Sequence, residues 1–409
     1  MAVARGRGHQ RVSSKSSFVF GCVVGLVVFF LMFFRSGRQE DFSVSKAINA
    51  PVREEVFGGL RFRKKKTVAW ATTVTGDGAF LVDAAAVLVE SARRSSSFSR
   101  YDVKFVALVS PKVSNGTRQL LKFVGFDEVL EKELPIEPSL IKGKVLREKW
   151  TKDPTKGGCC GAWELLKLYA WTLTQYHRVI HVDVDTMSLQ AIDELLDLNY
   201  SLIYTADYNM MSEAQRHKNI APAVQGGFLV IKPDLQVFEA LKKVAQDGKW
   251  GGDYGSGWEK SNIGYWWGGN TIQGLLPFFF AVKDPTNALE VDRCIYDNMV
   301  DRPVQSPPPR VGQIACRHAP IENIKFVHFT VCQKPWSCRP SKDPDDTRQL
   351  CLKLHSLWFE IRSHVETRFR LKTIKVPCSK QQGEGSRSRG KRLQYLPMAF
   401  PPPPIDSYS

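Results

Sequence analysis

RVIHVDVD, residues 178–185, is the segment that decides the fold. Its first five residues are mostly apolar and β-branched, which predicts a strand buried on both faces, as in a parallel sheet. Asp183 and Asp185 follow it directly. Because residues i and i+2 of an extended segment point the same way, we expect these two carboxylates to project together from the end of a buried strand.

Strand and helix patterns alternate on both sides of this segment. We expect strands at 67–74, 103–109, 129–130, 178–182, 201–206 and 226–231, and helices at 79–92, 117–125, 161–176 and 235–246. This alternation predicts an α/β fold, Rossmann-like, with a mainly parallel sheet and helices on both faces. In such sheets ligands bind outside the carboxyl ends of the strands, where Asp183 and Asp185 lie.

The paired aspartates favour a divalent cation. Two like charges at one strand end are costly unless a cation compensates them. Hard oxygen ligands suit Mn²⁺ or Mg²⁺, with diphosphate oxygens completing the coordination. A solvated surface turn is the alternative explanation of the sequence Asp183-Val184-Asp185. The buried strand before Asp183 favours the metal site over that turn.

The net charge of +16 is concentrated at the two ends of the chain. Residues 1–66 carry +9 and residues 371–409 carry +5, which leaves only +2 for residues 67–370. A nucleic-acid-binding domain needs positive charge on its folded surface, so this distribution argues against nucleic acid as a partner. With 43% hydrophobic residues, the chain is expected to fold around a core.

An uncharged run, FVFGCVVGLVVFFLMFF, occupies residues 18–34. It is at the short limit for a helix that crosses a bilayer core of about 30 Å, and short spans suit the thinner membranes of the early secretory pathway. A cleaved signal peptide is the alternative, but its apolar region is shorter and ends in small residues, whereas bulky Phe33 and Phe34 end this run. The basic residues that precede the run favour a cytoplasmic N-terminus.

We therefore predict a single-pass type II protein of the Golgi or endoplasmic reticulum membrane. Its parts are expected to be a cytoplasmic tail at 1–17, a transmembrane signal-anchor at 18–34, a polar stem at 35–66 and a lumenal folded domain at 67–370. Residues 371–409 are basic and rich in Gly, Ser and Pro, and are expected to form a flexible tail.

Sequons and cysteines agree with a lumenal glycoprotein. Asn115-Gly116-Thr117 and Asn199-Tyr200-Ser201 are glycosylation triplets. The chain has nine cysteines, of which Cys22 lies in the apolar run. The even number that remains permits disulfides in an oxidising compartment but does not select a pairing. Cys316-Arg317-His318 lacks zinc-type spacing, so we expect it in a disulfide-bearing loop.

Three motifs in order resemble glycosyltransferase family 8, the glycogenin-like group with the GT-A fold. They are WELLKLYAWTLTQYHRVIHVDVDTMSL (163–189), VQGGFLVIKP (224–233) and VHFTVCQKPW (327–336). The second is similar to the family's N-S-G-V-F-V-x-x-P, and the third to its H-F-x-G-x-x-K-P-W. The resemblance runs from Thr67 to Trp336, about two thirds of the chain.

The resemblance implies a set of site residues. Asp183, Asp185 and His328 would be the metal ligands, with Lys334 on the diphosphate and Lys167 facing the donor sugar or the carboxylates. The other positions implied to contact the donor or acceptor are Thr72 and Thr73 (uridine), Val184 within the D-x-D, Asp207 (donor sugar), Gln225, Gly226 and Gly227 (the Asn-Ser-Gly position), and Gln273 (acceptor side). Lys167, Asp207 and Gln273 are the candidate catalytic residues.

Three of these residues also have an ordinary structural explanation. His328 would otherwise be a strand histidine satisfied by a hydrogen bond, Lys167 an exposed helix lysine and Asp207 a helix or turn cap. Inside the 178–182 strand, His181 is interpreted as structural.

Several positions depart from the family pattern. The Asp expected before Gln273 is Ile272, so that carboxylate is absent or its role moves to Asp253 or another residue. The other departures are Val74 for Asn, Gln225 for Asn, Gly226 for Ser and Val331 for Gly. They affect the donor-sugar and acceptor positions more than the metal ligands. The aromatic stretch WEKSNIGYWWGGN (258–270) fits either stacking on sugar rings or core packing.

The function implied is a metal-dependent glycosyltransferase that retains anomeric configuration. It would move a hexosyl or related sugar from a UDP-sugar to a glycan, glycolipid or protein acceptor, with Mn²⁺ or Mg²⁺ as cofactor and no protein nucleophile. The alternative is a catalytically inactive, membrane-anchored sugar- or protein-binding module on the same fold, which the departures motivate. A glycosidase needs two acids across a cleft, and Asp183 and Asp185 are too close for that role.

Overall fold

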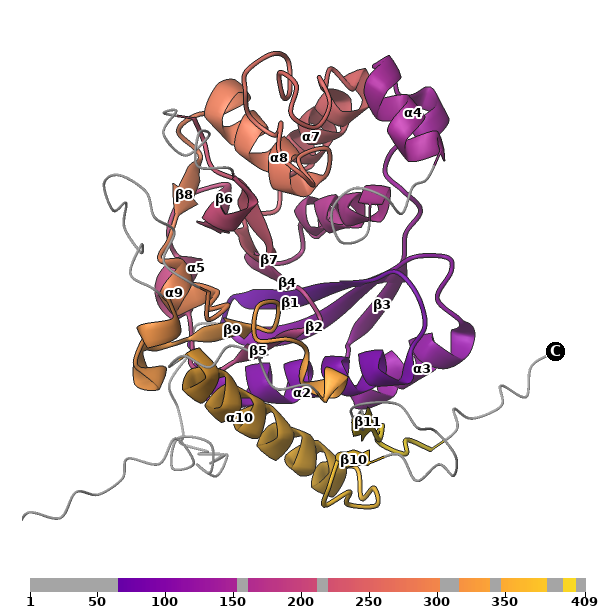
Figure 1. The fold of residues 1–409 in the computed structure, drawn as a ribbon, viewed down its shortest axis with the longest axis vertical. Helices are drawn as coiled ribbons and strands as arrows, with labels where there is room; N and C mark the ends of the chain where they lie inside the picture. Colours follow the sequence, from indigo (N-terminus) through magenta and orange to yellow (C-terminus); the bar gives the residue numbers. More distant parts are fainter. Residues whose placement is uncertain are drawn as a thin grey trace, which may run out of the picture. The chain divides into compact units, whose positions relative to one another are not determined.

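The computed structural model describes residues 65–152, 161–211, 220–301, 316–338, 347–380 and 393–401 (Figure 1). Their central feature is a seven-stranded sheet in the order β3-β2-β1-β4-β7-β6-β8. The strands are β1 Thr67–Val74, β2 Asp102–Val109, β3 Glu128–Glu131, β4 Arg178–Val182, β6 Leu202–Ala206, β7 Val224–Ile231 and β8 Ala288–Glu290. Neighbouring strands run parallel except β7, which is antiparallel to both β4 and β6. The predicted mainly parallel α/β sheet is confirmed.

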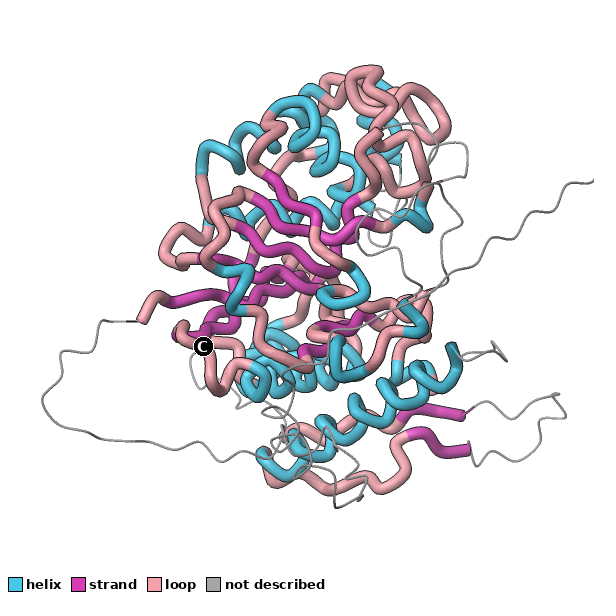
Figure 2. Tube along the Cα trace, turned by 90° about the vertical axis from the view of Figure 1, so that its left-hand side faces the viewer, coloured by secondary structure: helices cyan, strands magenta, loops and turns pink. Residues whose placement is uncertain are grey.

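Helices cover both faces of this sheet (Figures 1 and 2). Alternate residues of β1 show why: Val68 and Trp70 belong to the apolar core under α2 and α3, whereas Ala69 and Ala71 belong to the core under η2, α7 and α8. The longer helical segments are α2 Ala79–Ser95, α3 Asn115–Val124, α4 Lys144–Lys152, η2 Gly161–Thr172, α7 Leu235–Asp247, α8 Ile272–Phe278 and α10 Thr347–Arg368.

Short elements complete the described structure. The short helical segments are η1 Pro138–Leu140, α5 Asp193–Leu196, η3 Tyr208–Met210, η4 Phe279–Lys283, α9 Arg293–Tyr296, η5 Cys316–His318, η6 Ile321–Asn323 and η7 Pro335–Ser337, and the short strands are β5 Thr186–Ser188, β9 Phe326–His328, β10 Cys378–Lys380 and β11 Leu393–Tyr395.

A two-stranded sheet brings the last third of the chain to the end of β4. β5 follows the D-x-D segment and pairs antiparallel with β9, with Thr186 opposite His328. This pairing, which the sequence pattern did not predict, places His328 beside Asp183 and Asp185.

Three disulfides lie in the described C-terminal third. Cys294–Cys316, Cys332–Cys351 and Cys338–Cys378 have Cα–Cα distances of 4.7, 5.4 and 5.5 Å, within the normal range for disulfides. The expected disulfide-bearing loop at Cys316 is confirmed. Cys159 and Cys160 lie outside the described residues.

The prediction of a flexible tail at 371–409 is wrong for the described residues 371–380 and 393–401. β10 pairs with β11, Cys378 is bonded to Cys338, and the Phe400 ring lies edge-on to Phe123 and Phe369. The Gly-, Ser- and Arg-rich composition concealed these contacts, since a few aromatic anchors and one cysteine suffice to hold a short segment against a folded body.

The predicted anchor at 18–34 and nearly all of the stem lie outside the described residues. Among the helices that the structure does describe, none has the length and apolar character needed to cross a membrane.

Asp83, on α2, anchors the C-terminal segment. Its buried Oδ2 accepts hydrogen bonds from Tyr395 Oη at 2.5 Å and from Met398 N at 2.9 Å. The guanidinium of Arg362, on α10, donates to Tyr395 Oη at 3.0 Å and to the Leu396 carbonyl at 2.9 Å. A polar network therefore joins α2, α10 and the end of the chain.

We expect Tyr395→Phe to lower the free energy of unfolding by about 1–3 kcal/mol, because it leaves buried partners of the lost hydroxyl unsatisfied. Thermal denaturation of the variant measures the effect. Tyr254→Phe is the matched control, since the Tyr254 side chain is 77% exposed. Equal melting temperatures for the two variants would contradict the anchoring role of Tyr395.

Stability should also depend on pH through Asp83. Burial raises the pKa of Asp83 from 3.8 to about 6, outweighing the donors around it. The folded state therefore binds this proton more tightly than the unfolded state, so the contribution is present below pH about 4 and is lost as pH rises through 6. Relative to Asp83→Asn, which cannot ionise, the unfolding free energy of the unmodified chain should fall by about 3 kcal/mol between pH 4 and 8. Denaturant titrations across this pH range test it, and a constant difference would show that Asp83 does not titrate as stated.

Candidate metal and nucleotide-sugar site

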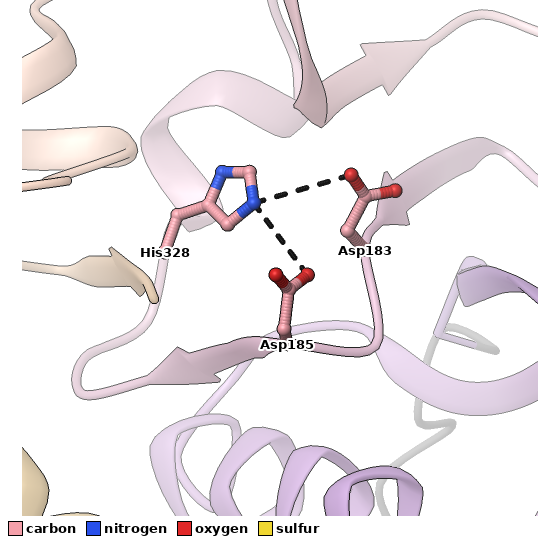
Figure 3. A group of neighbouring side chains, drawn as sticks. All are labelled: Asp183, Asp185 and His328. Atoms are coloured by element: carbon pink, nitrogen blue, oxygen red, sulfur yellow. Dashed lines mark ion pairs between the residues drawn. The ribbon is translucent and has the colours of Figure 1, made fainter. Parts of the chain in front are cut away.

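Asp183, Asp185 and His328 converge beyond the end of β4 (Figure 3). Nε2 of His328 lies 4.0 Å from Oδ2 of Asp183 and 3.5 Å from Oδ1 of Asp185. The His328 side chain is 3% exposed, whereas those of Asp183 and Asp185 are 28% and 13% exposed. Both carboxylates reach His328, although residues 184–185 form a turn rather than the extended segment on which the i, i+2 expectation rested.

The backbone holds this arrangement in place. Asp183 N donates to the Gly227 carbonyl at 3.3 Å, and Phe329 N donates to the Asp185 carbonyl at 3.0 Å. The first bond ties the D-x-D turn to β7, and the second ties it to the residue after His328. The position of each carboxylate is therefore set by main-chain contacts as well as by β4.

The three side chains fit a divalent cation. Ligands at about 2.1 Å from one octahedral ion are separated by about 3.0 Å when adjacent and about 4.2 Å when opposite. The His328 distances of 3.5 and 4.0 Å lie between these values, and one ligand atom from each of the three residues lies within 4.8 Å of the others. Two carboxylate oxygens and one imidazole nitrogen suit Mn²⁺ or Mg²⁺, although the arrangement does not identify the metal.

Two lysines place positive charge on the carboxylates. Lys167 lies on η2, is buried, and has its Nζ 2.7 Å from Asp183 Oδ1 and 2.9 Å from Glu164 Oε2. Burial lowers the pKa of Lys167, but Asp183 and Glu164 outweigh it and the net shift is upward, so the ammonium stays charged. Lys334 forms an ion pair with Asp185. The alternative of an ordinary exposed helix lysine is therefore wrong for Lys167.

Gly227 makes room for His328. A Cβ atom built on Gly227 would overlap the imidazole ring. The sequence predicted that glycine here allows a close approach of backbone to ligand. In the structure the group that approaches closely is the ring of His328.

Gly226 and Ile272 are a matched pair of departures from the family pattern. A Cβ on Gly226 would lie 2.8 Å from Cδ1 of Ile272 and 3.0 Å from Nζ of Lys167. The family's Ser at position 226 would crowd this Ile, so loss of the Ser side chain leaves room for the apolar residue that replaces the family's Asp. Asp253, the other carboxylate considered for that role, pairs with Lys149.

Gln225 and Asp207 form a buried polar pair beside these glycines. Gln225 Nε2 donates to Asp207 Oδ2 at 3.1 Å, and Gln225 Oε1 accepts from Gly227 N at 3.1 Å. Asp207 also caps η3 by accepting from Asn209 N at 3.0 Å. Burial, reinforced by the charge of Asp301, raises the pKa of Asp207 to about 6. Asp207 therefore has the capping contact expected of its structural alternative, and it also lies in the same polar network as Gln225.

The remaining predicted positions differ in their burial and contacts. Thr72 is fully buried in β1, while Thr73 Oγ1 lies 2.8 Å from His181 Nε2. His181 is buried, which lowers its pKa to about 3, so it is the structural residue we expected. Val184 packs against the core under α2, and Gln273 lies partly exposed in the first turn of α8.

The aromatic stretch 258–270 serves mainly as core. Trp258 and Trp266 are buried, and the indole N–H of Trp258 donates to the Gly269 carbonyl at 2.7 Å. Trp267 differs from them because it is 58% exposed. Core packing therefore explains Trp258 and Trp266, and stacking on a sugar ring stays a prediction for Trp267.

The motif analysis missed Asp297 and Thr205. Asp297 Oδ1 lies 3.3 Å from Nδ1 of His328, on the side of the ring opposite the D-x-D carboxylates. Thr205 Oγ1 donates to Asp297 Oδ2 at 2.9 Å. Neither residue belongs to one of the three motifs, and only the tertiary fold brings them to His328.

Comparisons with known proteins agree with the motifs. Human glycogenin-2 is 26% identical over 305 residues, covering 74% of this chain and 50% of the relative. Rabbit (Oryctolagus cuniculus) glycogenin-1 is 27% identical over 269 residues, covering 66% and 65%, and mouse (Mus musculus) glycogenin-1 is 28% identical over 234 residues, covering 57% and 56%. The chain thus spans about half to two thirds of the length of these curated relatives. No family model matches the chain.

Two solved structures illustrate the similarity at the level of coordinates. The galactosyltransferase LgtC, in complex with donor and acceptor sugar analogues, has a TM-score of 0.46 and 12% identity, with 72% of this chain and 95% of that chain covered. The bifunctional glycosyltransferase WbbM has a TM-score of 0.41 and 15% identity, with 74% and 53% covered. The curated relatives support the resemblance found in the motifs, which is to glycogenin-like glycosyltransferases of family 8.

Substitution of Gly227 by alanine should displace the His328 ring and weaken Mn²⁺ binding at least tenfold. The physical reason is the overlap between the new methyl group and the imidazole. Manganese titration followed by the electron paramagnetic resonance signal of free Mn²⁺ gives the affinity. Gly116→Ala is the control, because the nearest atom to a Cβ there is 4.0 Å away. An unchanged affinity in Gly227→Ala would mean that His328 is not a ligand.

Proposed function

We propose that this chain is a metal-dependent, retaining glycosyltransferase that moves a hexosyl or related sugar from a UDP-sugar to a glycan, glycolipid or protein acceptor. The observation that carries the proposal is the convergence of Asp183, Asp185 and His328 at the end of β4, from segments far apart in the sequence. The similarity to glycogenins supports the same class of reaction.

The proposed reaction requires positive charge next to the diphosphate of the donor. A divalent cation held by Asp183, Asp185 and His328 would neutralise charge that develops on the departing diphosphate. Lys334 is 38% exposed and lies at the open side of Asp185, where it would bind a diphosphate oxygen. Lys167 remains charged and buried, so its role is to keep Asp183 ionised and oriented.

The donor sugar would lie over Gly226, between Lys167 and the Gln225–Asp207 pair. Gln225 presents its amide to Asp207 and to Gly227 N, so this pair has a defined orientation before a ligand binds. Ile272 contributes an apolar wall where the family has a carboxylate. We assign no nucleophile among these side chains. Transfer on the front face, with the departing UDP accepting the acceptor proton, requires none.

We also propose that the enzyme is anchored in the Golgi or endoplasmic reticulum membrane with its catalytic domain in the lumen. The apolar run at 18–34 and the sequons support this topology. The three described disulfides support an oxidising compartment.

The second candidate is an inactive sugar- or protein-binding module. The pair Gly226 and Ile272 favours it, because the apolar wall removes a carboxylate that the family has beside the acceptor. In that case the chain would bind its sugar or protein partner without releasing UDP from any donor.

The test uses the purified full-length chain with a panel of UDP-sugars, with and without Mn²⁺. We expect Mn²⁺-dependent UDP release that Asp185→Ala reduces by about two orders of magnitude or more, because the cation loses a ligand. Asp102→Ala is the matched control. Asp102 is the first residue of β2, so it lies at the amino-terminal ends of the parallel strands, whereas Asp185 follows the carboxyl end of β4. Calorimetry with UDP and Mn²⁺ distinguishes the candidates. Metal-dependent UDP binding with UDP release from a donor would support the enzyme, whereas no metal-dependent UDP binding, or binding without release from any donor, would reject the enzyme and favour the inactive module.

A further inference from the structure

His328 has two ring nitrogens in different surroundings. Nε2 faces Asp183 and Asp185, while Nδ1 faces Asp297 Oδ1 at 3.3 Å. In the part of the chain that the structure describes, neither Nδ1 of His328 nor Oδ1 of Asp297 has a hydrogen-bond partner, and each is the other's neighbour at ion-pair distance. The two buried atoms can therefore satisfy only each other.

We infer that Asp297 is a positioning residue for the metal site, and that it holds the imidazole of His328 with the Nε2 lone pair directed at the cation. A neutral imidazole carries one N–H and one lone pair, and a carboxylate can only accept. Asp297 thereby places the proton on Nδ1 and leaves Nε2 free to bind metal, which is the arrangement that outer carboxylates impose on metal-binding histidines. This inference rests on the proposed metal-dependent function.

Asp297 is itself held in one orientation. Its side chain is 0% exposed, and its second oxygen accepts from Thr205 Oγ1, on β6, at 2.9 Å. Its backbone N–H donates to the Arg293 carbonyl at 3.0 Å, which ends α9. One carboxylate oxygen is thus held by Thr205, and the other lies 3.3 Å from Nδ1 of His328.

The residue after Asp297 fixes the distance to His328. Asn298 accepts from His328 N at 3.0 Å through its carbonyl, and its own N–H donates to the Phe326 carbonyl at 2.9 Å. Its side chain donates to the carbonyls of Cys294 and Cys316, which the disulfide joins. The disulfide, the Asn298 bonds and β9 therefore make one rigid unit that carries both Asp297 and His328.

Charge gives a further reason to assign Asp297 a function. Among the described residues, His328 is its single ion-pair partner, so no lysine or arginine balances this fully buried carboxylate. A buried carboxylate without a cation is destabilising. This cost is smaller beside an imidazole that binds a dication than in a purely structural position.

The test measures Mn²⁺ affinity of the full-length chain directly, by electron paramagnetic resonance of free Mn²⁺, with and without UDP. Asp297→Ala should weaken Mn²⁺ binding by about 10- to 100-fold, the usual effect of removing such an outer carboxylate. Asp297→Asn should recover part of the loss, because its amide oxygen still accepts from Nδ1–H. Thr205→Val should weaken binding by a few fold at most.

Asp83→Asn is the matched control, because Asp83 is another buried aspartate and lies away from the site. Melting temperatures in EDTA show whether each variant is folded when metal affinity is measured. Folded Asp297→Ala with unmodified affinity would overturn the inference, and so would an affinity loss in Asp297→Asn equal to that in Asp297→Ala. Failure of the unmodified chain to bind Mn²⁺ would instead reject the proposed function on which the inference rests.

Discussion

Repulsion between two carboxylates at one strand end is the constraint around which this site is organised. The turn after β4 brings Asp183 and Asp185 together. The ammonium groups of Lys167 and Lys334 supply positive charge to them, and Nε2 of His328 faces both. Like charges held this close are tolerated only where positive charge is supplied. The same requirement makes the site suitable for a divalent cation and a diphosphate.

The groups that face the two carboxylates come from two separate parts of the chain. Lys167 reaches the site from η2 before the strand, while His328 and Lys334 reach it through β9 and the loop that follows. Disulfides at Cys332 and Cys338 bracket Lys334, and Cys294–Cys316 supports the turn that contains Asp297. The segments that carry Asp297 and Lys334 are therefore tied down by disulfides. Asp183 and Asp185 follow a strand that is held by the sheet.

The departures at Gly226 and Ile272 have a steric explanation only when the two positions are considered together. Gly226 has no side chain where Ile272 places its Cδ1 atom, so the two residues accommodate each other. Together they turn one wall of the proposed donor pocket from polar to apolar and leave the metal ligands unchanged. The same pattern of change is compatible with a different donor or acceptor and with a binding module, and activity separates the two.

Local pattern in the sequence determined the α/β class, the strand positions around the D-x-D segment and the place of Asp183 and Asp185 directly after a buried strand, because strand and helix periodicity act within a few residues. It also indicated His328, Lys334 and Lys167, through motifs whose meaning depends on resemblance. Only the tertiary structure decided that Lys167 is buried, that β7 runs antiparallel, that residues 393–401 pack on the body, and that Asp297 and Thr205 stand behind His328. Those features arise from contacts between segments distant in the chain, and no local pattern records which distant side chains will share a buried space.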